Sequence, residues 1–121
     1  MKIESSLIRD KFEFTDHEGN ILKEVPFTIN ITEAADRLTS ARAELAKVVA
    51  SDNAADLKSS AARLFECIFG PAVTGEIMDY YADDSSAMII DLAPYLLDRV
   101  FPQIDKVRET ALEMKKRAKR G

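Results

Sequence analysis

The sequence predicts a mainly α-helical fold in which an N-terminal β-hairpin precedes a compact bundle of four to five helices (α+β with a minor β part). Two patterns carry this prediction. Apolar and polar residues alternate on both sides of a turn-forming segment, and from residue 34 onward apolar residues recur at every third or fourth position. The length of 121 residues fits a single domain. We expect a strand and hairpin region at 1–31, a helical bundle at 32–114 and a basic, frayed tail at 115–121.

The hairpin is predicted around the loop sequence TDHEGN, whose Asp, Gly and Asn residues are typical of a reversing loop. Phe12 and Phe14 alternate with charged neighbours before this loop. After it, one face of the second strand carries Val25, Phe27, Ile29 and Ile31. Such an apolar face must pack on another element. Pro26 cannot donate a ladder hydrogen bond, so it is expected at an edge or a bend, and His17 is expected as an exposed loop residue.

Two amphipathic helices are predicted after the hairpin. The first begins near Asn30, which has capping-box spacing to Glu33, with Thr32 as a competing cap. Its apolar face comprises Ala34, Leu38, Ala41, Leu45, Val48 and Val49. The residues Ser51, Asp52 and Asn53 then break the pattern and are candidate caps for the second helix. The apolar face of the second helix comprises Leu57, Ala61, Leu64, Phe65 and Ile68.

The stretch FGPAVTGE at 69–76 could be a phosphate-binding loop or a corner between helices. Gly70 and Gly75 have the required glycine spacing, but Glu76 stands where such a loop places lysine. A carboxylate there would repel phosphate, and the preceding segment has helical periodicity. We therefore predict a corner, with Gly70 in the αL conformation after one helix and Pro71 as the first residue of the next. This short helix, at 71–82, presents Val73, Ile77, Tyr80 and Tyr81.

The longest apolar pattern of the chain lies in its last third. Candidate caps precede it at Asp83, Asp84 and Ser85. The seam that follows comprises Ile89, Ala93, Leu96, Val100, Ile104, Val107, Ala111 and Met114. Pro94 and Pro102 interrupt this seam, so we predict kinks, or a break near FPQ that divides it into a fourth and a fifth helix. The seam can pack within one subunit or between several, which leaves a homo-oligomer as an open alternative.

The sequence has no pattern typical of catalysis, and we expect a non-enzymatic protein without a cofactor or metal. Cys67 is alone between apolar neighbours, which is typical of a buried small side chain. The acids Asp79, Asp83, Asp84 and Asp91 lack the ligand alternation of a Ca²⁺ loop and are interpreted as caps and solvated side chains. The chain has neither a bilayer-length apolar run nor a signal-peptide pattern at its start, so we expect a cytoplasmic protein with no membrane partner.

Two groups of residues are candidates for binding. The first is aromatic, and aromatic residues concentrate at protein interfaces: Tyr80, Tyr81, Tyr95 and Phe101. The alternative is that these side chains fill the core, and the sequence leaves both interpretations open. The second group is basic: Lys115, Lys116, Arg117, Lys119 and Arg120. Cations can contact nucleic acid or favour a helix C-terminus. No aromatic residue interleaves them for base stacking, so we expect no nucleic-acid partner.

The stretch FECIFGPAVTGEIMDYYADD at 65–84 combines a Phe-Gly corner, a short helix and a polar break. A polar β-ribbon and an alanine-rich helix precede it, and the closing segment MIIDLAPYLLDRVFPQIDKV follows it. Over roughly residues 10–110 this pattern resembles the tail assembly chaperones of long-tailed (siphovirus-type) phages and prophages of Gram-positive bacteria. The resemblance implies a chaperone that binds the tape measure protein, keeps it soluble and helps to recruit tail tube subunits. It also implies a location in the cytoplasm of the bacterial host and absence from the mature virion. The alternatives are an antitoxin or transcriptional regulator with a nucleic-acid-contacting tail, and a minor structural protein of the virion.

Overall fold

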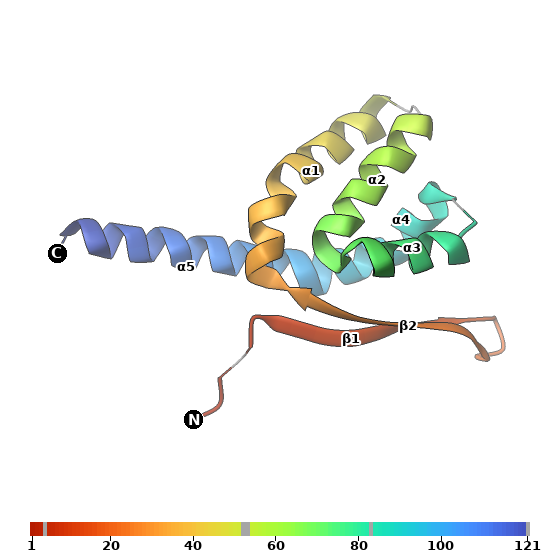
Figure 1. Ribbon diagram of the computed structural model, residues 1–121, viewed down its shortest axis with the longest axis horizontal. Helices are drawn as coiled ribbons and strands as arrows, with labels where there is room; N and C mark the ends of the chain where they lie inside the picture. The colour runs from red at the N-terminus through yellow and green to blue at the C-terminus, as the bar shows by residue number, and fades with distance from the viewer. Residues whose placement is uncertain (4, 52–53, 83, 121) are drawn as a thin grey trace.

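A two-stranded antiparallel sheet lies along one side of a group of helices in the computed structural model, which confirms a mainly α-helical fold with an N-terminal β-hairpin (Figure 1). The elements in chain order are β1 (Leu7–Thr15), β2 (Ile21–Asn30), α1 (Ile31–Ser51), α2 (Ala54–Phe69), α3 (Pro71–Tyr80), α4 (Ser85–Tyr95), the π-helical turn η1 (Leu96–Val100) and α5 (Phe101–Arg120).

The structure describes residues 1–3, 5–51, 54–82 and 84–120, with the backbone alone at 42, 44, 45, 48, 49, 51, 54 and 55. Several predicted positions therefore lie outside the described side chains: Leu45, Val48, Val49, Ser51, Asp52, Asn53 and Asp83.

The hairpin has the apolar face that its alternating sequence predicts. Val25, Phe27 and Ile29 are buried, whereas the residues between them are exposed. Pro26 lies opposite Lys11 in the antiparallel register. Because the sheet has only two strands, each strand is an edge, and the expected edge position of Pro26 is confirmed.

The loop of the hairpin is organised by Asp16. Its carboxylate accepts hydrogen bonds from the backbone N–H groups of Glu18 and Asn20, each at 2.9 Å, and from the Asn20 amide at 3.1 Å. The bonds from Asn20 lower the pKa of the Asp16 carboxyl. Gly19 takes a φ of +87°, as the loop composition predicts, and His17 is exposed in the loop.

Helix α1 begins where the sequence places a cap. The Asn30 side-chain oxygen accepts a hydrogen bond from the Glu33 backbone N–H at 3.2 Å and another from the Thr32 hydroxyl at 2.7 Å. Asn30 is thus the N-cap, and Thr32 supports it instead of competing with it. The buried residues of this helix, Ile31, Ala34, Ala35, Leu38 and Ala41, belong to the common core.

The corner between α2 and α3 is confirmed, but its conformation differs from the prediction. Gly70 has φ 85° and ψ 164°, which is not αL but an extended region with positive φ that is essentially restricted to glycine. Its N–H donates to the Glu66 carbonyl at 3.0 Å, while its carbonyl accepts from the Thr74 N–H at 3.1 Å. Gly70 therefore ends one helix and caps the next, with Pro71 in the first helical turn as expected.

The break predicted near FPQ is absent, because the chain is helical from Ser85 to Arg120. Asp84 caps this long helix by accepting a hydrogen bond from the Ala87 N–H at 3.1 Å. At η1 the Phe101 N–H bonds to the Leu96 carbonyl, five residues earlier. This wider turn directly precedes Pro102, whose ring would clash with a carbonyl of a regular helix. A π-helical turn thus replaces the predicted break.

The π-helical turn also keeps one row of side chains on the core. The buried row is Met88, Leu92, Leu96, Val100 and Ile104, spaced by four residues. Four residues of an α-helix advance by about 40° beyond a full turn, so such a row drifts around the helix. The extra residue of η1 rotates the later members back by about 100°. The seam predicted through Ile89 and Ala93 was therefore misplaced at its start, since neither residue is fully buried.

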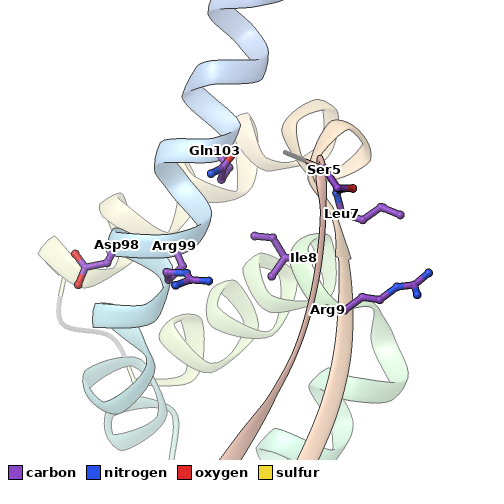
Figure 2. A pocket seen from close by; sticks show the side chains of 7 residues that line it. All are labelled: Ser5, Leu7, Ile8, Arg9, Asp98, Arg99 and Gln103. Carbon is purple, nitrogen blue, oxygen red and sulfur yellow. Dashed lines mark hydrogen bonds between the residues drawn. The ribbon is translucent and has the colours of Figure 1, made fainter. Parts of the chain in front are cut away.

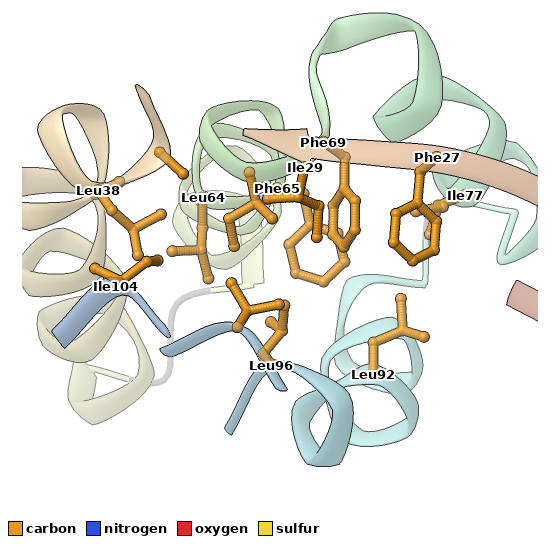
Figure 3. Packing of buried hydrophobic residues seen from close by; sticks show 14 of the residues in the cluster. Phe27, Ile29, Leu38, Leu64, Phe65, Phe69, Ile77, Leu92, Leu96 and Ile104 are labelled. Carbon is orange, nitrogen blue, oxygen red and sulfur yellow. The ribbon is translucent and has the colours of Figure 1, made fainter. Parts of the chain in front are cut away.

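The core lies where the hairpin, the first half of α1, the second half of α2, α3 and the α4–η1–α5 helix meet (Figure 3). Phe27 and Phe69 pack edge to face, with ring centroids 5.1 Å apart, and Phe65 contacts Phe69 in the same way at 5.8 Å. Leu92 and Leu96 close this cluster from the α4 and η1 side (Figure 3).

Helix α5 leaves the helical body and carries the C-terminus away from it (Figure 1). The fraying expected at 115–121 is not found in the described residues, because α5 stays helical to Arg120. The Arg117 guanidinium contacts the Glu113 carboxylate one turn earlier at 3.4 Å, and cations near a helix C-terminus favour the helix dipole. Ala111 and Met114, predicted as the end of the core seam, are exposed on this projecting helix.

Candidate functional site

The projecting helix α5 carries an apolar stripe that no described part of the chain covers fully. Its members, Val107, Ala111, Met114 and Ala118, are three or four residues apart and therefore share one face. Val107 is half-buried and the other three are exposed, Met114 to 66%. We call these four residues the α5 stripe.

A groove runs beside the first half of this stripe. Its volume is about 440 Å³, and its wall opposite α5 is formed by Ser5, Ser6 and Thr32. The α5 wall comprises Gln103, Lys106, Val107, Thr110, Ala111 and Met114. We call this hollow the α5 groove. A second hollow, also of about 440 Å³, lies on the flank of α5 and is lined by Glu109, Thr110, Glu113, Met114 and Arg117. The two hollows share Thr110 and Met114.

Arg108 fixes the base of α5 to the body of the protein. Its guanidinium donates to the Ala35 carbonyl at 3.1 Å and also to the hydroxyl of Thr39, both in α1. These bonds, together with burial of Ile104, anchor the start of the helix. The α5 groove is therefore bounded by an anchored part of α5, while the helix beyond it is exposed on most of its surface.

Sequence reasoning considered Thr32 only as a helix cap, and it did not single out the other polar groove residues: Ser5, Ser6, Gln103, Lys106 and Thr110. Ser5 and Ser6 belong to no motif, and only folding brings residues 5–6 beside residues 103–114. The backbone N–H of Ile31 donates to the Ser6 carbonyl at 3.1 Å, which holds this N-terminal segment in place. The sequence did contain a sign of the apolar stripe, because apolar residues continue at helical spacing after Ile104 in a segment that is otherwise charged.

The basic residues of the tail are all exposed on the last turns of α5: Lys115, Lys116, Arg117, Lys119 and Arg120. Arg117 is paired with Glu113, as described above. The segment 115–120 contains five cations and no acid, although the whole chain has a formal net charge of −4. The last turns of α5 are thus strongly positive within an acidic protein.

The aromatic candidates lie elsewhere and face the hairpin. Tyr80 stacks on Phe14 with centroids 4.2 Å apart, and Tyr81 meets the same ring edge to face at 5.6 Å. Tyr95 packs edge to face on Phe12 at 5.1 Å. All three tyrosines are half-buried. The structure therefore brings the three tyrosines together at the contact between the hairpin and the helices. It does not place them on the α5 groove.

Two tyrosine hydroxyls in this seam bond to carboxylates. The Tyr81 hydroxyl donates to Asp91 at 2.9 Å, and the Tyr95 hydroxyl donates to Asp10 at 3.4 Å. Burial, followed by the contact with Asp91, raises the pKa of Tyr81 well above its usual value. Burial and the nearby charge of Asp10 likewise raise the pKa of Tyr95. Both hydroxyls thus remain protonated donors at neutral pH.

Phe101, the fourth aromatic candidate, is half-buried and packs against the core at the start of α5. Cys67 is half-buried as well, not fully buried as expected, and its thiol donates to the Arg37 carbonyl at 3.6 Å.

A cavity of about 520 Å³ separates the start of β1 from η1 and α5 (Figure 2). Ile8 and Arg99 point toward one another across it, whereas Leu7 and Arg9 point to the other side of the strand and Asp98 points away from β1 (Figure 2). The ionisable lining residues therefore do not converge on a common point. The arrangement lacks the paired acid and base of a hydrolytic site.

Two further observations concern the described residues alone. None of their His, Cys, Asp and Glu side chains form a group of three that could hold a metal ion. Nor does any helix formed by these residues combine the length and the apolar character that spanning a bilayer requires.

Comparison of the chain with protein-family models, with curated proteins and with solved structures finds no match.

Proposed function

We propose that this protein is a non-enzymatic tail assembly chaperone of a long-tailed phage or prophage. In this role it binds the tape measure protein in the cytoplasm of the bacterial host, keeps it soluble and helps to recruit tail tube subunits around it. The protein then leaves the assembly and is absent from the mature virion. The proposal combines the resemblance of roughly residues 10–110 to such chaperones with the geometry of α5.

The observation that carries the proposal is the uncovered α5 stripe beside the α5 groove. A small protein rarely leaves an apolar face on a projecting helix without using it for an interaction. A groove flanked by a helix is also the usual receptor for an amphipathic helix of a partner. The exposed apolar helices expected of a tape measure protein would aggregate in water, and coverage by a charged protein would prevent this.

The proposal is tested by co-expression with the tape measure protein of the same phage or prophage. We expect the tape measure protein to be soluble only when this chain is present, and to co-purify with it and with the tube protein. A tape measure protein that stays insoluble, and that does not co-purify, would overturn the proposed function.

Two variants test whether the α5 groove is the surface that binds the tape measure protein. Met114→Asp places a charge in the stripe and should greatly reduce co-purification. Leu97→Asp is the matched control, because Leu97 is similarly exposed (59%) but lies on η1, away from the groove. Equal loss of co-purification in both variants would show that the α5 groove is not the binding surface.

A second candidate, a regulatory module that contacts nucleic acid, is favoured by one observation: the five cations of 115–120 are exposed on a helix. Such binding would weaken steeply with salt and disappear when residues 115–120 are deleted. Absence of DNA and RNA binding at physiological salt would remove this candidate.

A further inference from the structure

We propose that the free edge of β1 at Arg9 is a second binding surface, which takes an extended acidic segment of a partner protein as a third strand of the sheet. This surface is separate from the α5 groove, and the inference does not depend on the proposed function. It follows from the direction of the backbone groups along β1, from the cavity beside that strand and from the charges around it.

The register shows which backbone groups of β1 face outward. The Ile31 N–H donates to the Ser6 carbonyl at 3.1 Å, and these two residues form the next pair of the β1–β2 register. In an antiparallel pair, residues that bond across the pair alternate with residues whose N–H and C=O point away from it. Leu7, Arg9 and Lys11 therefore direct their N–H and C=O groups toward the free edge of β1.

Two of these outward N–H groups already have partners. The Leu7 N–H donates to the Ser5 hydroxyl at 3.0 Å, and the Lys11 N–H donates to the Asp10 carboxylate at 2.8 Å. The N–H and C=O of Arg9, which lies between them, have no hydrogen-bond partner among the described residues. Arg9 thus offers one donor and one acceptor, the pair of groups that one residue of an added antiparallel strand would bond.

The edge of β2 does not offer the same site. Pro26 lies opposite Lys11, so by the same alternation its ring nitrogen lies on the outer side of β2. Proline has no N–H to donate there, which interrupts strand addition in the middle of this edge. The edge that is open to a further strand is therefore that of β1.

The cavity of about 520 Å³ lies along this open part of β1 (Figure 2). Its lining residues belong to Ser5 and the start of β1 on one side and to η1 and α5 on the other, and none belongs to β2. Leu7 and Arg9 line the cavity although their side chains point to the other side of the strand, which agrees with an outward backbone at these positions (Figure 2). A third strand would run about 4.8 Å from β1, on the side where the cavity lies.

The side chains of an added strand would meet one arginine on each face. Residues directly opposite one another in a sheet share a face, so the residue that bonds Arg9 would place its side chain beside the Arg9 guanidinium. Its neighbours in the strand would point to the other face, where Ile8 and Arg99 point toward one another across the cavity (Figure 2). Asp98, the acid among the lining residues, points away from β1.

Neither arginine has an acidic partner in the described chain. Arg9 and Arg99 are exposed, and neither forms an ion pair with a described residue. The residues next to Arg9 on its face of the hairpin carry no acid: Leu7, Lys11 and Thr28. The nearest acids on that face, Glu13 and Glu24, are paired with Lys11. Carboxylates of an added strand would therefore be attracted on both faces, which favours an acidic segment.

The β1 edge of a second copy is a poorer occupant. Symmetric pairing of two β1 strands about Arg9 would place the two Arg9 side chains directly opposite one another, and like charges in that arrangement are destabilising. It would also align Leu7 of each copy with Lys11 of the other, and the N–H groups of both are already bonded. An acidic strand avoids the repulsion and needs only the free groups of Arg9.

The experiment uses the full chain and three short peptides with Val and Thr at their ends, whose three central residues are all Glu, all Gln or all Lys. We expect the Glu peptide to bind about fivefold or more tightly than the Gln peptide, with a smaller preference at high salt. Hydrogen exchange followed by NMR should show added protection of the Arg9 amide, because strand addition bonds this N–H. No binding, equal affinity of the three peptides, or binding without protection of Arg9 would overturn the inference.

Two substitutions of Arg9 separate the backbone from the charge. Arg9→Pro removes the outward N–H but no bond between β1 and β2, so it should abolish binding of the Glu peptide. Arg9→Gln keeps the N–H and should only weaken binding. Circular dichroism verifies that both variants fold, and if Arg9→Pro does not, the exchange measurement on the wild type decides. Equal binding by two folded variants would show that the peptide does not pair with the strand.

The cavity side is tested by Arg99→Gln, which should reduce the preference for Glu over Gln. Arg37→Gln is the matched control, because it makes the same charge change at an exposed position of α1 that does not line the cavity. We expect this control to keep the full preference. Equal loss in both variants would mean that only net charge acts, and the assignment of Arg99 to the site would be wrong.

Three further outcomes distinguish other occupants and the proposed function. Self-association in analytical ultracentrifugation that Arg9→Pro abolishes, without peptide binding, would assign the edge to a second copy and contradict the inference. Met114→Asp should leave peptide binding unchanged, and its loss in that variant would place the peptides in the α5 groove instead. If the Glu peptide binds at Arg9 but the tape measure protein does not co-purify, only the proposed function fails.

Discussion

The aromatic ring of Tyr80 stacks on that of Phe14, with centroids 4.2 Å apart and ring planes inclined by 17°. Tyr80 is the last residue of α3, and Phe14 lies near the end of β1. The stack therefore fastens the loop end of the hairpin to a helix that follows it by more than fifty residues in the sequence. Without such contacts, an isolated two-stranded hairpin is marginally stable in water.

Replacement of Tyr80 by leucine should lower the free energy of unfolding by about 1 kcal/mol, because leucine retains apolar contact but loses the ring geometry. Urea denaturation followed by circular dichroism measures this change. Tyr80→Phe keeps the ring and should leave the stability nearly unchanged. If Tyr80→Leu were as stable as the wild type, the stack would not contribute to holding the hairpin.

Stability should decline at alkaline pH through Tyr81. Its pKa in the folded protein is raised above the usual tyrosine value of about 10, so folding favours the protonated hydroxyl. The stabilisation is therefore fully present below about pH 10 and is lost as the pH rises above that value toward the folded pKa.

Tyr81→Phe removes both the hydrogen bond to Asp91 and the titration. It should be about 1 kcal/mol less stable than the wild type at neutral pH, yet lose less stability between about pH 8 and pH 11. Thermal unfolding measured across this range tests the prediction. Tyr95, whose pKa is also raised, keeps part of the dependence in the variant. If the stability of Tyr81→Phe and of the wild type fell in parallel over this pH range, the prediction would be wrong.

A charge in the core row should prevent folding. Val100 is 0% exposed, and an unpaired carboxylate at such a position costs several kcal/mol, a large part of the stability of a small domain. Val100→Asp should therefore lack a cooperative thermal transition. Leu97→Asp, three residues earlier on the exposed side, should unfold like the wild type. A normal transition in Val100→Asp would mean that this row does not form the core.

Two glycines give opposite predictions for the same substitution. Gly70→Ala places a side chain at φ 85°, ψ 164°, and should cost about 1–3 kcal/mol. Gly75 lies inside α3, and no neighbouring atom lies within 4 Å of the position that an alanine methyl group would take. Gly75→Ala should therefore stabilise the protein by up to about 1 kcal/mol. Chemical denaturation of both variants measures the two changes. Stabilisation by Gly70→Ala would be inconsistent with the positive φ at the corner.

Local sequence signals predicted the elements well where the cause is local. The cap at Asn30, the glycine in the hairpin loop and the Gly-Pro corner all depend on a few neighbouring residues, and each is found in the structure. Predictions that required knowledge of a partner element were less accurate. The core row begins with Met88 and Leu92, not with Ile89 and Ala93, because the π-helical turn changes the phase of the helix and a regular period cannot anticipate it.

The candidate site shows the same division. The sequence singled out the tyrosines for their chemistry, and the structure places them between the hairpin and the helices. The sequence also identified Ala111 and Met114 as apolar positions of a long seam. It could not show that the residues of this seam after Val107 are exposed. The α5 groove needs Ser5, Ser6 and Thr32 beside α5, and residues so distant along the chain have no shared sequence pattern.

The sequence by itself thus determined the order and type of the elements, because alternation, helical period, caps and glycines act within a few residues. The tertiary structure decided which apolar residues are buried and which remain as the α5 stripe, because burial depends on the element that lies opposite. The sequence also places five cations at 115–120 and predicts a frayed tail there, but the structure continues α5 as a helix to Arg120 and so gives these cations fixed positions around the helix axis.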